Sequence, residues 1–167
     1  MLKSLKTNNL THKNLRADCI HLAAGKPFDS VKISGFEGGF PFGKKNTRAT
    51  DLFYLSPEAL IEKYADNSDV WSIGVLAYVI LSGTPISTKQ SAQDLMQSVS
   101  HGAFEFHDPV WFSVSLEAKD FITQACRKDP KFRLSLDSAL EHKWIASTSN
   151  EKGKQIKKKT LQSLKNF

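Results

Sequence analysis

The 167-residue sequence contains only two cysteines, Cys19 and Cys126, which are far apart and not in a CxxC spacing. A disulfide framework needs several paired cysteines, and a structural zinc site needs clustered cysteine or histidine ligands. The sequence indicates neither of these, and no metal-binding motif of another kind. We therefore expect a protein of a reducing compartment, the cytoplasm.

Long apolar runs are also absent. The longest covers residues 73–81, about half of the ~20 residues that a membrane-spanning helix needs. Met1 is followed by Leu-Lys-Ser-Leu-Lys, which lacks the apolar core of a signal peptide. We expect a soluble protein without a membrane span.

The middle of the sequence has no excess of basic residues, although the net charge of the chain is +6. The balance of basic and acidic residues is +4 for residues 1–26, −3 for 27–150 and +5 for 151–167. A protein face that binds nucleic acid needs a basic patch on the folded part. We therefore expect a basic tail at 147–167 and no nucleic-acid partner.

Apolar residues are plentiful, at 40% with eleven Phe and three Trp, which predicts a packed core. The segments CIHL at 19–22 and SVKI at 30–33 flank a turn of Ala-Ala-Gly-Lys-Pro and predict a small hairpin. An irregular loop at 34–56 follows, and helical spacing with serine or proline starts dominates afterwards. The expected fold is mainly α, with strands at 19–22 and 30–33 and helices at 57–63, 69–81, 91–101, 115–126 and 135–142.

Several motifs occur together in a fixed order. The run DVWSIGV at 69–75 follows the triplet SPE at 56–58, and KDPKFRLS at 128–135 and ALEHKWI at 139–145 come later. In this order and spacing they resemble the protein kinases, from about residue 10 to residue 145. The run at 102–122 resembles the calcium- and calmodulin-dependent group of serine/threonine kinases, and calcium-dependent protein kinases in particular.

The resemblance implies a partial kinase domain. Residues 1–146 correspond to the C-terminal lobe, and no GxGxxG strand pair, Val-Ala-x-Lys strand or Glu-bearing helix precedes residue 10. We therefore expect the N-terminal lobe to be missing from this sequence. The tail at 147–167 resembles the start of the autoinhibitory junction that follows the lobe in calcium-dependent kinases.

The segment HKNLRADC at 12–19 stands where the family has His-Arg-Asp-Leu-Lys-Pro-Glu-Asn. By that resemblance, Asn14 replaces the aspartate that accepts the proton of the substrate hydroxyl, and an amide is not a useful base. Arg16 replaces a lysine and keeps its charge. Cys19 replaces the asparagine that holds a second magnesium ion, and sulfur is poorly matched to that cation.

The segment Ser34-Gly35-Phe36-Glu37 stands in the place of the Asp-Phe-Gly motif. Gly35 has no side chain and cannot coordinate the magnesium that bridges the ATP phosphates. Glu37, two residues after Gly35, stands in place of the motif's glycine, and we expect its carboxylate to point in the wrong direction. His21 replaces an apolar residue beneath the adenine base. We therefore expect no cofactor for this chain, although the family uses ATP and magnesium.

Residues that the resemblance assigns to the scaffold are retained. It implies a buried ion pair between Glu58 and Arg133, and an Asp69 side chain that holds the backbone of the 12–19 loop. It also implies that His12 and Phe36 stack in an internal spine. A retained scaffold with lost chemistry is typical of a pseudokinase, and the scaffold residues are His12, Phe36, Glu58, Asp69, Trp71 and Arg133.

The segment GGFPFGKK at 38–45 allows two interpretations. It meets the GxxxxGK part of a P-loop, but Lys45 replaces the magnesium-binding Ser or Thr, and no good helix start follows. The resemblance places the same region in the activation loop. Thr47 and Thr50 are then candidate phosphorylation sites, and Lys13 keeps the charge of the arginine that orders this loop.

Three functional hypotheses follow. The first is a binding or regulatory pseudokinase, whose surface around residues 91–101 contacts an active kinase or a substrate protein. The second is a fragment of a parent kinase that binds ATP and phosphorylates protein Ser/Thr through an N-terminal lobe outside this sequence, and the third is a nonfunctional fragment. In the tail, Leu161, Leu164 and Phe167 share one side of a helix with lysines between them, which predicts binding to calmodulin or an EF-hand domain.

Overall fold

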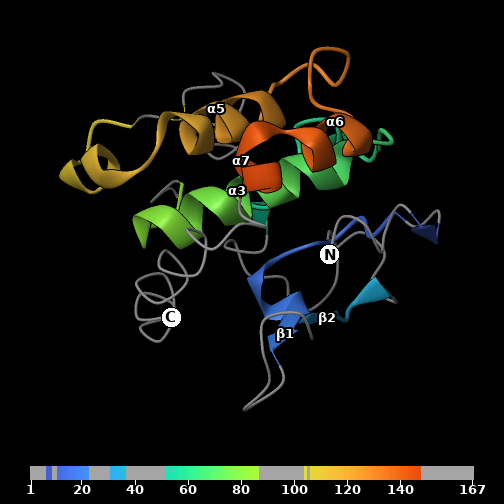
Figure 1. Ribbon diagram of the computed structural model, residues 1–167. Helices are drawn as coiled ribbons and strands as arrows, with labels where there is room; N and C mark the ends of the chain where they lie inside the picture. The colour runs from blue at the N-terminus through green and yellow to red at the C-terminus, as the bar shows by residue number, and fades with distance from the viewer. Residues whose placement is uncertain are drawn as a thin grey trace.

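The computed structural model describes residues 7–8, 11–22, 31–36, 52–86, 104 and 106–147. These residues are mainly helical with one small antiparallel sheet, as the sequence predicts (Figure 1). None of the helices in this part of the chain is long and apolar enough to cross a membrane. In chain order the elements are η1 Ala17–Cys19, β1 Ile20–Leu22, β2 Val31–Ile33, η4 Ala59–Ile61, α3 Ser68–Ser82, η5 Pro109–Ser113, α5 Leu116–Ala125, α6 Leu136–Glu141 and α7 Lys143–Ser147.

Helix α3 is the central element of the core. It is apolar along almost its whole surface and is buried from Ser68 to Tyr78, as expected for a helix that has no polar face. It ends at Gly83, which adopts a left-handed conformation with φ of 70°, where glycine pays no steric penalty. The predicted helix at 69–81 is confirmed.

Helices α5 and α6 begin at serine caps. The Ser115 hydroxyl accepts a hydrogen bond from the Ala118 N–H at 3.2 Å, and the Ser135 hydroxyl accepts one from the Ser138 N–H at 3.1 Å. Each cap satisfies a backbone donor that the first turn of a helix leaves free. The predicted helices at 115–126 and 135–142 are therefore confirmed. In Figure 1, α5, α6 and α7 lie together on α3, away from the hairpin.

Two short elements differ from the sequence prediction. The expected helix at 57–63 is only the 3-10 turn Ala59–Ile61, because Glu62 turns into the left-handed region with φ of 60° and ends it. Helix α7 was not predicted as a separate element; His142, with ψ of 136°, breaks the helix between α6 and α7. The predicted helix at 91–101 lies outside the described residues.

The hairpin has its predicted strands. Strand β1 pairs antiparallel with β2, with Ile20 opposite Ile33 and His21 opposite Lys32. Ile20 and Ile33 both pack against the main core cluster. Because Ile20 begins β1 and Ile33 ends β2, the 12–19 segment and residues 34–36 leave the same end of the sheet, and these two segments form the candidate site.

Helices α3 and α5 approach each other closely at Gly74. A Cβ atom at this position would lie 2.5 Å from the Cys126 Sγ and 2.9 Å from the Ala125 Cβ. Real side chains do not come this close, so the contact requires a residue without a side chain.

We expect Gly74→Ala to destabilise the protein. Overpacking of a core costs about 1–3 kcal/mol, which exceeds the roughly 1 kcal/mol that alanine gains over glycine in a helix. Gly83→Asn is the matched control, because nothing lies within 4 Å of a Cβ there and asparagine tolerates the left-handed region. Urea unfolding followed by tryptophan fluorescence should show a lower midpoint for Gly74→Ala alone. Equal midpoints for the two variants would contradict the close approach.

Candidate functional site

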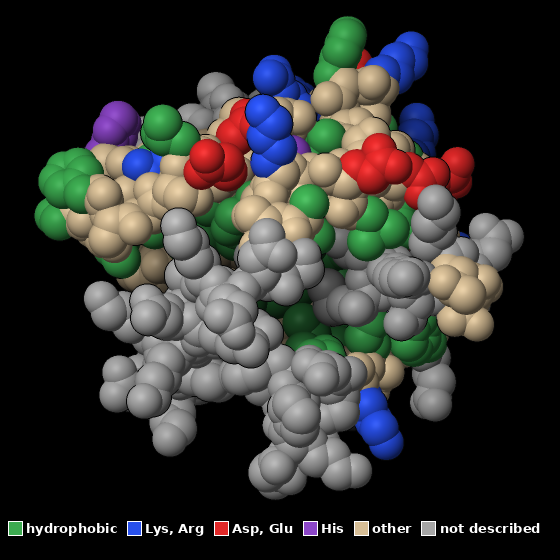
Figure 2. Space-filling view, viewed as in Figure 1, with side chains coloured by type: hydrophobic (Ala, Val, Ile, Leu, Met, Phe, Trp, Pro, Cys, Tyr) green, Lys and Arg blue, Asp and Glu red, His purple; other side chains and the backbone are tan. Residues whose placement is uncertain are grey.

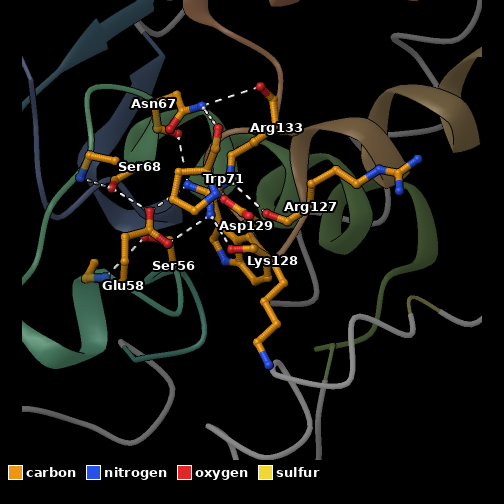
Figure 3. Close-up of polar contacts among 12 residues, drawn as sticks. Ser56, Glu58, Asn67, Ser68, Trp71, Arg127, Lys128, Asp129 and Arg133 are labelled. Atoms are coloured by element: carbon orange, nitrogen blue, oxygen red, sulfur yellow. Dashed lines mark hydrogen bonds and ion pairs between the residues drawn. The ribbon is translucent and has the colours of Figure 1, made fainter.

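A buried ion pair links two segments that are distant in the sequence (Figure 3). The Arg133 Nη1 lies 2.6 Å from the Glu58 Oε1, and the Arg133 Nη2 lies 2.9 Å from the Glu58 Oε2. The Arg133 side chain is 0% exposed and that of Glu58 12%. The structure thus brings together the two residues of the expected pair, in the bidentate geometry that makes such pairs strong.

Further hydrogen bonds satisfy both partners of this pair. Arg133 also donates from Nε to the Arg127 carbonyl at 3.0 Å and from Nη2 to the Lys128 carbonyl at 3.2 Å. The Glu58 Oε1 accepts hydrogen bonds from the hydroxyls of Ser56 and Ser68, both at 2.7 Å. Burial raises the pKa of Glu58, but Arg133 and the two serines outweigh this effect and hold that pKa below its usual value.

Two more residues complete the surroundings of the pair. The Arg133 guanidinium lies over the ring of Trp71, with Cζ 5.2 Å from the ring centroid, a favourable cation–π contact. The Asn67 side chain donates to the Pro130 carbonyl at 2.9 Å. Sequence reasoning missed Asn67 and Ser68, whose types and spacing give no signal, whereas Ser56 belongs to the SPE triplet.

Asp69, in the first turn of α3, holds the backbone of the 12–19 loop. Its Oδ2 accepts a hydrogen bond from the His12 N–H at 2.5 Å and its Oδ1 one from the Lys13 N–H at 2.9 Å. Asp69 is 5% exposed. Burial raises its pKa, and the two backbone donors and nearby cations reduce that rise without cancelling it. The loop is therefore fixed through its backbone, independently of the side chains that it carries.

Lys13 lies in a strained conformation and contacts a tyrosine. Its φ is 64°, a region that is uncommon for residues other than glycine. Its ammonium lies 5.7 Å from the centroid of the Tyr64 ring, and the Tyr64 hydroxyl donates to the Lys13 carbonyl at 3.2 Å. Burial, with help from Asp69 and Glu62, raises the pKa of Tyr64 to about 12. Tyr64 was not predicted, and Thr47 and Thr50 lie outside the described residues.

His12 connects the loop to the segment after β2. Its Nε2 lies 2.8 Å from the Ser34 carbonyl oxygen, and a carbonyl only accepts, so we assign the hydrogen to Nε2. Its Nδ1 then accepts the Asn14 N–H at 3.3 Å. The ring contacts Phe36 with centroids 4.5 Å apart and planes tilted by 48°. Phe36 is nevertheless 41% exposed, so the expected contact is present whereas the expected enclosure in an internal spine is not.

Asn14, which by resemblance occupies the position of the catalytic base, is buried. Asn14 is 8% exposed, and its backbone carbonyl lies 3.6 Å from the Cys19 sulfur, which donates to it. The neighbouring cation, Arg16, has its Nε 2.9 Å from the Asp18 Oδ1. The positive charge at 16 is thus engaged by a local carboxylate.

Cys19 and Gly35, which by resemblance replace the two magnesium-holding residues, pack against each other. A Cβ at Gly35 would lie 3.0 Å from the Cys19 Sγ, and φ at Gly35 is +87°. Magnesium requires oxygen ligands in octahedral geometry, and neither residue offers a side-chain oxygen. Asp18 and Asp69 are engaged by Arg16 and by the loop backbone. The side chains described at this site therefore do not fit magnesium. Glu37 lies outside the described residues.

Other predicted features are placed as follows. His21 is exposed, with its Nε2 2.6 Å from the Ser34 hydroxyl. Acidic and basic side chains are interspersed over the helical part of the face that Figure 2 shows, and no single basic patch appears there. The tail anchors Leu161, Leu164 and Phe167 lie outside the described residues.

Comparisons with known proteins agree with these motifs. Residues 2–145 match the family described as protein kinase domain. Calcium-dependent protein kinase 1 of Arabidopsis thaliana is 34% identical over 160 residues, which cover 93% of this chain and 26% of that protein. The calcium/calmodulin-dependent protein kinase type 1 of Caenorhabditis briggsae is 42% identical over 145 residues, covering 85% and 41%. The chain thus spans about a quarter of the plant relative and two fifths of the nematode one.

Proposed function

The chain belongs to the protein kinase family, and from this premise we propose that it is the C-terminal lobe of a calcium-dependent-type serine/threonine kinase in which phosphoryl transfer has been lost. In this proposal residues 1–146 form the lobe, and the protein is a pseudokinase of the cytoplasm that acts by binding other proteins. Its relation to the calcium-dependent protein kinases rests on the family match and on the identities above.

One observation carries the proposal. The Glu58, Arg133 and Asp69 side chains all keep buried hydrogen bonds, whereas the positions that by resemblance hold the base and the metal ligands carry an amide, a thiol and no side chain. Removing the base alone costs on the order of 10²–10⁴ in rate. A loop whose backbone is held by Asp69 although it lacks these groups supports a role in protein binding.

The partner surface that we propose is the one around residues 91–101, which lies outside the described part of the chain. The partner is a protein, either an active kinase related to this chain or the substrate protein of such a kinase. The retained framework would hold the lobe in the shape that a partner of this kind contacts.

The coverage of the relatives favours a second candidate. Because the matched region is only 26% of the Arabidopsis relative, the alternative is that these residues belong to a longer kinase that binds ATP and phosphorylates protein Ser/Thr through an N-terminal lobe. The transcript sequence upstream of the Met1 codon separates the two candidates, because the second requires an open reading frame with a GxGxxG strand pair there.

Thermal unfolding in the presence of magnesium and ATP tests the loss of the metal site. A ligand that binds the native state at 100 times its Kd stabilises it by about 2.7 kcal/mol. We expect no rise in Tm for the purified chain with millimolar Mg²⁺ and ATP, compared with KCl of equal ionic strength. A rise that needs both Mg²⁺ and ATP would contradict the proposal.

Calmodulin is the partner that we propose for the tail, since the nematode relative is named for its dependence on calcium and calmodulin. We expect a 151–167 peptide to bind calmodulin only with calcium, and Leu164→Glu to weaken binding more than the adjacent Lys165→Ala, because apolar anchors dominate such grooves. Isothermal titration calorimetry measures both. Equal losses, or binding without calcium, would indicate a nonspecific basic tail.

A further inference from the structure

Helix α7 begins at a histidine cap, the side chain of His142. The backbone of His142 lies outside the helical region, with φ of −58° and ψ of 136°, as is usual for the residue before a helix. Its carbonyl accepts the N–H groups of Ile145 and Ala146, both at 2.9 Å. Its ring Nδ1 accepts the Trp144 N–H at 3.3 Å. Histidine therefore takes the place that serine, threonine, aspartate or asparagine usually has at such a cap.

The hydrogen-bond partners of the His142 ring define its charge. A backbone N–H only donates, so Nδ1 must accept and carries no hydrogen. Nε2 then carries the hydrogen and donates to the Asp120 Oδ2 at 3.2 Å. This arrangement needs the neutral ring, because a protonated imidazole has a hydrogen on both nitrogens. Protonation would place a second hydrogen between Nδ1 and the Trp144 N–H, and the cap would be lost.

The charged groups beside the ring act in both directions. Asp120 on α5 favours a protonated ring, but its side chain is 55% exposed, and exposed ion pairs contribute little. The Asp120 carboxylate also accepts a hydrogen bond from the Gln124 amide at 2.8 Å, and chiefly for this reason the pKa of Asp120 lies below its usual value. Lys143, the next residue after His142, adds a positive charge near Asp120, and Glu141 precedes His142 at the end of α6.

The position of the ring opposes a positive charge. The His142 side chain is only 9% exposed, and burial disfavours the charged form of a histidine. The ring also lies at the N-terminal end of α7, where the backbone N–H groups carry a partial positive charge. Together with the loss of the cap, these two effects outweigh the attraction of one exposed carboxylate.

Packing connects the cap to the core. His142 and Trp144 both contact Phe121 of α5, with ring centroids 5.2 Å apart in each case. Phe121 is fully buried, and Trp144 and Ile145 pack against the main core cluster. Without its cap, α7 would therefore pack less firmly on α5.

We propose that His142 is a pH-sensitive clasp, whose protonation opens the cap of α7 and loosens the packing of this helix on α5. The clasp stabilises the protein while the ring is neutral. This stability is lost as the pH falls, in the range of about pH 8 to 5 over which histidine ordinarily takes up its proton. The proposal goes beyond the proposed loss of phosphoryl transfer and does not depend on it.

Thermal unfolding of the full chain at about pH 7.5 and about pH 5.5 tests the clasp. The matched variant is His142→Asn, because an asparagine oxygen can cap a helix at either pH. On acidification, we expect the Tm of the wild-type chain to fall by about 2–4 °C more than that of His142→Asn, the shift that corresponds to the loss of one cap. An equal fall, or a smaller fall in the wild-type chain, would overturn the proposal.

A second measurement needs no variant. Labelling with ¹⁵N-tryptophan gives backbone amide signals for Trp71, Trp111 and Trp144 alone. Between the same two pH values, the Trp144 amide proton should shift more than those of Trp71 and Trp111, which lie in the core. If His142→Asn does not fold, this comparison decides. A shift confined to Trp144 supports the proposal, whereas an unchanged Trp144 signal or equal shifts of all three refute it.

Discussion

Arg133→Ala is expected to lower the free energy of unfolding by about 3–5 kcal/mol, the cost of removing one partner of a buried ion pair. The change leaves the Glu58 carboxylate near the core with only two serine donors. It also removes the donors that the Arg127 and Lys128 carbonyls use. Because small domains have only about 5–15 kcal/mol of stability, urea unfolding followed by circular dichroism should show a markedly lower midpoint.

Two controls separate this effect from a general loss of positive charge. Arg127→Ala removes an exposed side chain beside the pair and should change stability by no more than about 0.5 kcal/mol. The double variant Glu58→Ala/Arg133→Ala should cost less than the sum of its two single variants, since the stranded charge is then gone. A midpoint for Arg133→Ala that equals that of Arg127→Ala would show that the pair does not stabilise the protein.

Restoring an aspartate at position 14 is expected not to restore phosphoryl transfer. A general base contributes on the order of 10²–10⁴ in rate, but it acts on a phosphate that the metal ions must hold. Gly35→Asp cannot simply restore the metal ligand. Its φ of +87° is strained for a side chain, and the new Cβ would lie 3.0 Å from the Cys19 sulfur. The measurement is incorporation of radiolabelled phosphate by Asn14→Asp, with Asn14→Ala as its matched control.

The outcome that contradicts this assignment is also specific. If Asn14→Asp incorporates label above Asn14→Ala, the phosphate is held by residues other than those at positions 19 and 35. The roles given to Cys19 and Gly35 would then be wrong, although the family membership would stand.

Local signals in the sequence predict much of the fold. Helix α3 follows from its apolar run, helices α5 and α6 follow from helical spacing with serines at their starts, and the hairpin follows from two short segments around a turn that contains Gly and Pro. The 3-10 turn at 59–61 does not follow, because it depends on the left-handed Glu62, whose sequence carries no turn signal. The break before α7 at His142 also has no turn signal in the sequence.

The site was less accessible to sequence reasoning. Glu58 and Arg133 are 75 residues apart, so only the family resemblance could pair them. The contact of Lys13 with Tyr64 depends on how the loop packs on the segment between η4 and α3. The grouping of Cys19 with Gly35 depends on how the loop packs on the end of the hairpin. Spacing along the chain does not encode either contact.

The most direct test of a retained scaffold with lost chemistry is a phosphoryl-transfer assay of the folded wild-type chain. Purified protein, with native circular dichroism and Cys126 protected from alkylation, is incubated with radiolabelled ATP, Mg²⁺ and a generic protein substrate. The account predicts incorporation at the level of a heat-denatured sample at every time point. Incorporation that rises with time and is abolished by EDTA would contradict it.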